Sequence, residues 1–215
     1  MPLSPNDAST LARDICYLAP IVPVLVVEDV ATARPLAEAL VAGGLPALEV
    51  TLRTPAALDV IRAMAEVPGG TVGAGTLITP DDVRAAKDAG AVFGVSPGAT
   101  DELLLACEEE ELPLLPGAAT ASEAMRLLGR GYSMLKFFPA EASGGAPALK
   151  ALSSPLPQIS FCPTGGVSPA NAADYLSCPN VVCAGGSWVA PKPMVNAQDW
   201  AGIEGLARDA AALKR

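Results

Sequence analysis

Histidine is absent from this chain of 215 residues. Because histidine is the commonest general base and the commonest metal ligand, its absence excludes a zinc site built on imidazole. It also excludes a Ser-His or Cys-His nucleophile pair. Acid and base catalysis would have to come from Glu, Asp, Lys, Tyr, Cys or water.

Long apolar runs and a basic leader are also missing. The longest apolar run, 19–27, is about half of what a membrane-spanning helix needs. Arg13 is the only basic residue among the first thirty, so we expect no signal peptide and a cytoplasmic location. Hydrophobic residues make up 51% of the chain and charged residues 17%, which is too apolar for disorder. The length predicts a single domain over residues 1–215.

The charge balance is acidic, with a formal net charge of −9. This argues against nucleic acid and anionic membrane surfaces as partners. A phosphorylated small ligand is still compatible, because backbone N–H groups bind phosphate whatever the net charge. The five cysteines form no Cys-x-x-Cys motif, and we expect reduced thiols packed as small apolar residues.

A repeating unit of apolar strand, turn and alanine-rich amphipathic helix runs along the chain. The alternation predicts a parallel sheet, and eight units in 215 residues predict a (β/α)8 barrel that follows an N-terminal helix at 6–17. A doubly wound sheet needs the same alternation, but its Gly-x-Gly-x-x-Gly fingerprint is absent. The predicted strands are 21–27, 47–52, 71–76, 92–96, 114–116, 134–138, 159–163 and 181–184.

Start and stop signals predict the helix boundaries. Thr54, Thr79 and Ser168 each precede a proline and are predicted N-caps. The glycines at 43–44, 90 and 129 are predicted to end helices. The predicted helices are 30–42, 55–65, 80–89, 101–110, 121–128, 169–176 and 199–213.

Lys136 lies in the apolar run 133–140, which is predicted to be a buried strand. Taking an ammonium out of water is costly, and a lone buried lysine usually loses its proton. A neutral amine is the form that attacks a carbonyl carbon to make a Schiff base. A buried structural ion pair is the alternative, although such pairs are seldom more stable than apolar replacements.

Strand alternation predicts which side chains accompany Lys136. Catalytic groups of a barrel lie at the carboxyl ends of its strands. If Lys136 points inward, Glu49 is its predicted partner and would move protons in place of histidine. Arg53 and Thr76 would lie higher, at the mouth. There Arg53 can bind a substrate carboxylate with two parallel N–H bonds, or else be a solvated surface residue.

Glycine pairs follow the last two predicted strands, at 165–166 and 185–186. Loops at these two strands form the usual phosphate site of a barrel, and the helix N-terminus after each loop would add N–H groups. Either pair alone is also compatible with a tight turn. Pro97 and Phe138 would be apolar walls of the pocket, and plain core packing is the alternative for Phe138.

Six segments carry motifs in a fixed order over nearly the whole chain. They are Leu48-Glu-Val-Thr-Leu-Arg-Thr54, Val72-Gly-Ala-Gly-Thr76, Ser96-Pro-Gly98, Lys136-Phe-Phe-Pro-Ala140, Cys162-Pro-Thr-Gly-Gly-Val167 and Gly185-Gly-Ser-Trp188. Together they resemble the 2-keto-3-deoxy-6-phosphogluconate (KDPG) aldolases of the Entner–Doudoroff pathway, a family that also acts on 4-hydroxy-2-oxoglutarate.

The resemblance implies a class I aldolase on a (β/α)8 barrel, in a homotrimer without metal or organic cofactor. Its ligands would be a phosphorylated 2-keto-3-deoxy sugar acid and pyruvate. Lys136 would be the Schiff-base lysine and Glu49 the general acid and base. The other implied contacts are Arg53 and Thr76 to the pyruvyl carboxylate, Pro97 and Phe138 in the pocket wall, Thr164 to the substrate chain, and Gly165, Gly166, Gly185, Gly186 and Ser187 to the phosphate.

The expected reaction is therefore cleavage of KDPG to pyruvate and glyceraldehyde 3-phosphate. The galactonate epimer and 4-hydroxy-2-oxoglutarate are alternative substrates. A phosphate-binding barrel isomerase or epimerase is a different class and would not need the strand lysine. A sugar-phosphate-binding barrel without activity would bind ligand but form no imine.

Overall fold

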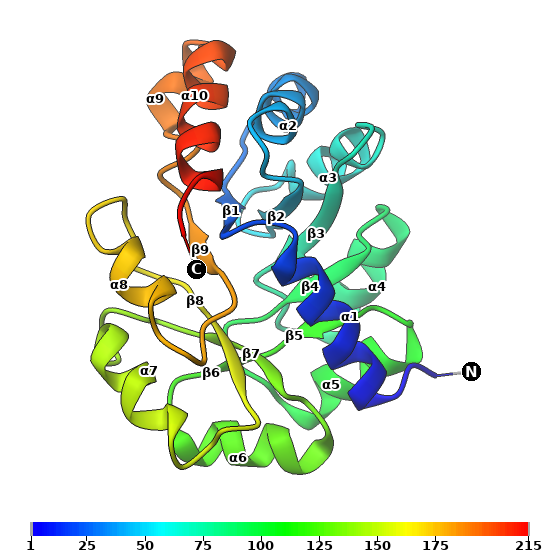
Figure 1. The fold of residues 1–215 in the computed structure, drawn as a ribbon. Helices are drawn as coiled ribbons and strands as arrows, with labels where there is room; N and C mark the ends of the chain where they lie inside the picture. Colours follow the sequence, from blue (N-terminus) through cyan, green and yellow to red (C-terminus); the bar gives the residue numbers. More distant parts are fainter. Residues whose placement is uncertain (1, 215) are drawn as a thin grey trace.

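Residues 2–214 are described by the computed structural model of the chain. Parallel strands lie at its centre and helices surround them (Figure 1). The strands are β1 Ile21–Leu25, β2 Ala47–Thr51, β3 Thr71–Gly75, β4 Phe93–Val95, β5 Leu114–Leu115, β6 Gly117–Ala118, β7 Met134–Phe137, β8 Ser160–Pro163 and β9 Ala184–Gly186. The helices are α1 Pro5–Tyr17, the 3₁₀ helix η1 Val30–Thr32, α2 Ala33–Ala42, α3 Ala57–Ala65, α4 Pro80–Asp88, α5 Asp101–Glu109, α6 Ala121–Arg130, α7 Gly145–Ser153, α8 Ala172–Leu176, α9 Lys192–Asn196 and α10 Trp200–Ala211.

The strands close into the predicted (β/α)8 barrel. One sheet has the order β5-β4-β3-β2-β1-β9 and the other the order β6-β7-β8. β5 and β6 are two halves of one strand, interrupted at Pro116. The parallel bridges Phe161–Val181 and Thr164–Gly185 join β8 to the β9 segment. The nine strands of the described chain therefore fill the eight places of a barrel.

The last strand begins later than predicted. The sequence predicts it at 181–184, but β9 is Ala184–Gly186. Between the two bridges the β8 side has two residues and the β9 side three, so the β9 segment carries a bulge. The extra residue explains why the adjacent side chains Val182 and Cys183 both belong to the apolar cluster inside the barrel.

Two of the three predicted N-caps are wrong. Thr79 does cap α4, in a capping box with Asp82. Thr54 instead donates its hydroxyl hydrogen to the carbonyl oxygen of Val27 at 2.7 Å, and α3 begins only at Ala57. The Ser168 N–H donates to the Asn171 side chain at 2.7 Å, so a turn precedes α8. In both cases the hydroxyl that would cap a helix hydrogen-bonds elsewhere, since the Ser168 hydroxyl also donates to Asn171 Oδ1, at 3.3 Å.

Glycine ends the helices mostly where the sequence predicts. Gly44 and Gly90 have φ of +92° and +96°, the left-handed conformation typical of a helix end. Gly129 lies inside α6, and Gly131, with φ of +112°, ends that helix instead. The helices α7 and α9 are not among the predicted ones. No helix within residues 2–214 has the length and apolar character needed to span a bilayer.

The apolar core has two parts. The larger part fills the layer between strands and helices. The smaller part lies inside the barrel and includes Cys16 of α1, because α1 closes the amino-terminal end (Figure 1). Ser9 Oγ fixes that helix by accepting hydrogen bonds from the N–H groups of Ser133 and Met134 at 2.8 and 2.9 Å. Because α1 covers the amino-terminal end, a ligand site can form only at the carboxyl-terminal end of the barrel.

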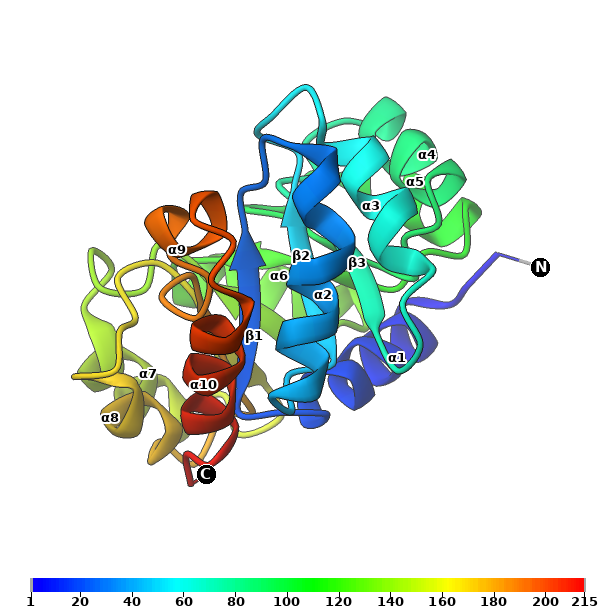
Figure 2. The same cartoon turned by 90° about the horizontal axis from the view of Figure 1, so that it is seen from above.

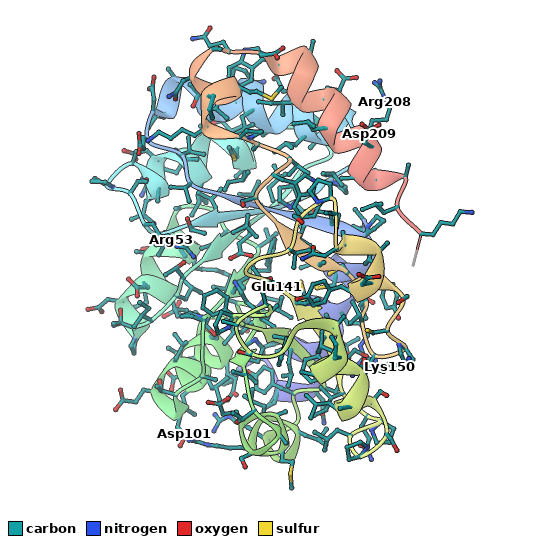
Figure 3. The ribbon with its side chains drawn as sticks, turned by 90° about the vertical axis from the view of Figure 1, so that its left-hand side faces the viewer. Arg53, Asp101, Glu141, Lys150, Arg208 and Asp209 are labelled. Carbon is teal, nitrogen blue, oxygen red and sulfur yellow. The ribbon has the colours of Figure 1, made fainter. Side chains whose placement is uncertain are left out.

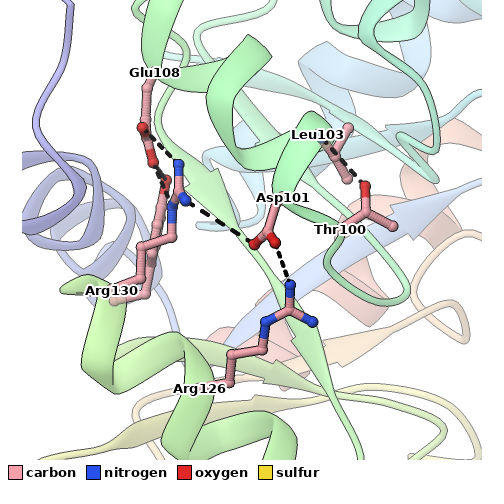
Figure 4. A network of polar contacts seen from close by, with 7 residues as sticks. Thr100, Asp101, Leu103, Glu108, Arg126 and Arg130 are labelled. Carbon is pink, nitrogen blue, oxygen red and sulfur yellow. Dashed lines mark hydrogen bonds and ion pairs between the residues drawn. The ribbon is translucent and has the colours of Figure 1, made fainter.

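Ion pairs join α5 and α6 on the outside of the barrel (Figure 4). Arg126 lies 2.6 Å from Asp101, and Arg130 lies 3.0 Å from Glu108. Hydrogen bonding and charge from Arg126 hold the pKa of the Asp101 carboxyl below its usual range. The Arg126–Asp101 pair is exposed and contributes little to stability, whereas the Arg130–Glu108 pair is partly buried.

Close packing of α2 against α10 depends on Gly43, which directly follows α2 (Figure 2). A Cβ atom there would overlap Ala207 Cβ and lie 2.7 Å from the carbonyl oxygen of Glu204. We expect Gly43→Ala to lower the free energy of unfolding by about 1–3 kcal/mol, because α10 must shift. Thermal unfolding followed by circular dichroism measures the change.

Gly129→Ala is the matched control for this prediction. Apart from its chain neighbours and the backbone of its own helix, no described atom lies within 4 Å of a Cβ added to Gly129. Alanine is the better helix former, so this variant should gain up to about 1 kcal/mol. A Gly43→Ala protein as stable as Gly129→Ala would contradict the close approach of α10.

Candidate active site

Lys136 and Glu49 meet inside the barrel. Lys136 lies on β7 and Glu49 on β2, and Lys136 Nζ is 3.2 Å from Glu49 Oε1. Their side chains are 4% and 3% exposed. The prediction that Lys136 and Glu49 both point into the barrel is therefore confirmed. Since desolvating two charges costs more than most pairs regain, such a pair favours a functional interpretation.

Glycine makes the space for this pair. A Cβ on Gly75 of β3 would overlap Glu49 Oε1 and lie 2.7 Å from Glu49 Cγ. On the other side, Lys136 is aligned with Gly117 of β6 and Cys162 of β8. The strands next to the two charged residues thus contribute small side chains, and a larger residue at position 75 would displace the carboxylate.

The Phe138 ring covers the amine. Lys136 Nζ lies 5.2 Å from the centre of that ring. Phe138 and Pro97 also line a cavity of 470 Å³ that extends between α5 and α6. Neither Lys136 nor Glu49 lines this cavity, so Phe138 borders both the cavity and the amine. A role for Pro97 and Phe138 as pocket walls stays a prediction.

Arg53 and Thr76 come together just after the ends of β2 and β3, where Arg53 Nε donates to Thr76 Oγ1 at 3.3 Å. Arg53 is exposed and is labelled in Figure 3. Strand alternation alone would turn Thr76 to the same side as Ala74, which packs in the outer core. The left-handed backbone of Thr76, with φ of +64°, turns it to Arg53 instead. A β-branched residue in that conformation is strained, and such strain is typical of functional sites.

Thr164 is buried and lies against Gly185, the first residue of the glycine pair at 185–186. A Cβ on Gly185 would overlap Thr164 Oγ1. Gly186 is packed against the Trp188 ring, while Ser187 is exposed. The structure thus brings the segment after β8 and the end of β9 together, as the barrel prediction requires.

The N–H groups of this region come from loops. The sequence predicts that the N-terminus of the helix following each loop adds N–H groups, but the helices that follow begin later than predicted or were not predicted. α8 begins at Ala172 and α9 at Lys192, and each has five residues. Gly165 and Gly166 have φ of +98° and +84°, so the loop after β8 needs glycine at both positions. Any anion here would meet loop N–H groups.

A cluster of thiols beside Lys136 was not predicted. Cys16, Cys162 and Cys183 lie in one cluster although they come from α1, β8 and the segment before β9. Interaction with the Cys162 thiol, together with burial, raises the pKa of Cys16 well above its ordinary value, so this thiol stays neutral. Within residues 2–214, no group of three or more His, Cys, Asp or Glu residues is arranged to hold a metal ion.

Comparison with known proteins places the chain in a family. Residues 12–206 match the family of KDPG and KHG aldolases. The chain belongs to this family. The 2-dehydro-3-deoxy-phosphogluconate aldolase of Pseudoalteromonas atlantica is 54% identical over 202 residues, 94% of either chain. The resemblance seen in the six motifs is confirmed.

Solved aldolases of this family share the fold. The 2-keto-3-deoxy-6-phosphogluconate aldolase of Zymomonas mobilis superposes with a TM-score of 0.90, at 51% identity over 94% of this chain and 97% of its own. The KDPG aldolase of Legionella pneumophila was solved with pyruvate captured at low pH as a covalent carbinolamine. It superposes with a TM-score of 0.90, at 46% identity over 93% of this chain and 98% of its own.

Strain at Thr76 generates a stability prediction. We expect Thr76→Gly to raise the free energy of unfolding by up to about 1 kcal/mol, because glycine adopts a positive φ without penalty. The same variant should raise the KM for substrate, because Arg53 loses its hydroxyl partner. Chemical denaturation and steady-state kinetics measure the two effects.

Gln198→Gly is the control, since Gln198 has φ of +55° and is exposed. It should gain stability without any change in KM. A Thr76→Gly variant less stable than the parent would show that the backbone at Thr76 is not strained.

Proposed function

We propose that this aldolase cleaves KDPG to pyruvate and glyceraldehyde 3-phosphate, through a Schiff base on Lys136. The observation that carries the proposal is the buried amine, 3.2 Å from the Glu49 carboxylate and 4% exposed. An isomerase or a binding barrel would need no such lysine. The family and its characterised relatives are aldolases, which supports the same reaction class.

The first step joins enzyme and substrate. The Lys136 amine attacks the C2 carbonyl carbon, and the carbonyl oxygen leaves as water after two proton transfers. Glu49 is close enough to accept the ammonium proton and to return a proton to the departing oxygen. The iminium that results is an electron sink next to C3.

The second step breaks the C3–C4 bond. The C4 hydroxyl loses its proton, the aldehyde leaves, and the bonding electron pair enters the iminium to give an enamine. C3 then takes up a proton, and water hydrolyses the iminium to release pyruvate and the free amine. Glu49 is the carboxylate nearest to these events, so we assign it the proton transfers.

Groups around the mouth would hold the two ends of the substrate. Arg53 and Thr76 would bind the pyruvyl carboxylate, and Thr164 would meet the chain near C4, where the galactonate epimer differs. The loops after β8 and β9 would bind the phosphate with Gly165, Gly166, Gly185, Gly186 and Ser187. The unpaired N–H groups of the loop after β8 favour KDPG over 4-hydroxy-2-oxoglutarate, which has no phosphate.

Several expectations from the sequence stay predictions. They are the homotrimer, the cytoplasmic location, the lack of a cofactor, and the single domain over 1–215, of which residues 1 and 215 lie outside the described range.

Replacing Lys136 tests the proposal. Lys136→Arg keeps a cation beside Glu49 but cannot form an imine, so we expect kcat to fall by at least about 10³-fold. Lys136→Ala should be equally inactive, and less stable because Glu49 loses its partner. Pyruvate release, measured with lactate dehydrogenase and NADH, gives the rate, and circular dichroism checks the fold.

Lys150→Arg is the control, because Lys150 is exposed on α7. It should retain the activity of the parent protein. Turnover by Lys136→Arg at the rate of Lys150→Arg would overturn the proposed mechanism.

A further inference from the structure

Glu141 lies against the glycine loop after β8, although no sequence motif singles it out. It is labelled in Figure 3 and follows the end of β7. A Cβ on Gly166 would overlap Glu141 Cγ and lie 2.7 Å from Glu141 Cβ. The absence of a side chain at Gly166 therefore lets this carboxylate side chain pack directly on the loop.

The Glu141 carboxylate is held by two donors. Glu141 Oε1 accepts hydrogen bonds from the Tyr175 hydroxyl and, at 3.3 Å, from Asn171 Nδ2. Asn171 Nδ2 also donates to the carbonyl oxygen of Gly166 at 3.1 Å. Tyr175 is buried, and burial together with the bond to Glu141 raises its pKa, so its hydroxyl remains a donor.

The backbone completes this arrangement. The Ala140 N–H donates to the Thr164 carbonyl at 2.8 Å, and the Glu141 N–H donates to the Gly165 carbonyl at 3.0 Å. Asn171 donates to the third carbonyl oxygen, that of Gly166. The carbonyl oxygens of residues 164, 165 and 166 therefore all point to the side of the loop on which Glu141 lies.

The N–H groups of the same peptides face the other way. In a planar trans peptide the N–H points opposite to the C=O. The N–H groups of Gly165, Gly166 and Val167 therefore point away from Glu141. The bridge between Thr164 and Gly185 directs the Gly165 N–H toward the Gly185 carbonyl, whereas neither Gly166 nor Val167 donates to a protein acceptor within the part of the chain that the structure describes. Two adjacent unpaired N–H groups form a site for an anion.

We infer that Glu141 is a positioning residue for the phosphate-binding loop. Its carboxylate, with Tyr175 and Asn171, keeps the three carbonyl groups turned away so that the N–H groups of Gly166 and Val167 meet the substrate phosphate. The inference rests on the proposed function, because it takes the substrate to be phosphorylated.

The charge of Glu141 makes the inference sharply testable. A carboxylate near a phosphate repels it, so removal of the charge alone would strengthen phosphate binding. Loss of the positioning contacts would weaken binding. Weaker phosphate binding after removal of the Glu141 side chain therefore indicates a positioning role, and tighter binding indicates charge repulsion alone.

The experiment compares Glu141→Ala, Glu141→Gln and Tyr175→Phe with the parent protein. The Kd for inorganic phosphate is measured by titration calorimetry, and KM and kcat are measured with KDPG. For Glu141→Ala we expect Kd and KM to rise about tenfold with little change in kcat. Glu141→Gln keeps the acceptor oxygen but removes the charge, so its Kd should equal or fall below that of the parent. Tyr175→Phe, which loses one donor, should raise Kd by less than Glu141→Ala does.

Asp174→Ala is the matched control, since it removes an exposed carboxylate of α8 that makes no hydrogen bond to the loop. Its Kd for phosphate should not rise. Imine formation with pyruvate, which has no phosphate, should be the same in all variants.

Two results would overturn the inference. One is phosphate binding by Glu141→Ala as tight as, or tighter than, that of the parent. The other is an equal loss of imine formation with pyruvate, which would show general damage to the site. If the parent forms no imine but Glu141→Ala still weakens phosphate binding, the proposed function fails and the positioning role stands.

Discussion

The ion pair between Lys136 and Glu49 inside the barrel is the constraint on which the rest of the site depends. Two charges with side chains 4% and 3% exposed lose most of their hydration, and their mutual attraction seldom repays that loss in stability. The barrel accommodates them with glycine at position 75 and small residues beside Lys136 on the adjacent strands. In return, the amine and the carboxylate can exchange a proton without bulk water, which a chain without histidine needs for imine chemistry.

The acidic net charge of −9 and the binding of an anionic substrate are compatible because the proposed anion contacts are local. Arg53 supplies one exposed cation at the mouth, next to Thr76. The other end of the substrate would meet backbone N–H groups of the loop after β8, which are partial charges fixed by the fold. Their orientation depends on where the carbonyl groups of the same peptides bind, and hence on residues that touch no substrate atom.

Alternation and burial made the barrel and the Lys136–Glu49 pair predictable, because both follow from a period of two along each strand. What the sequence could not predict depends on contacts between distant segments. Thr54 and Ser168 have the local signature of an N-cap, yet they form hydrogen bonds with Val27 and Asn171 and cap no helix. The bulge before β9 depends on its pairing with β8. The hydrogen bond from Tyr175 to Glu141 spans 34 residues, a separation at which no local pattern exists.

Borohydride reduction in the presence of pyruvate, followed by peptide mass mapping, identifies the lysine that forms the imine. We expect a reduced pyruvyl adduct on the peptide that contains Lys136, and no adduct on the other four lysines. The adduct should be absent from the Lys136→Arg protein. A folded protein that gives no adduct, or one that is modified at another lysine, would contradict the assignment of Lys136 as the Schiff-base residue.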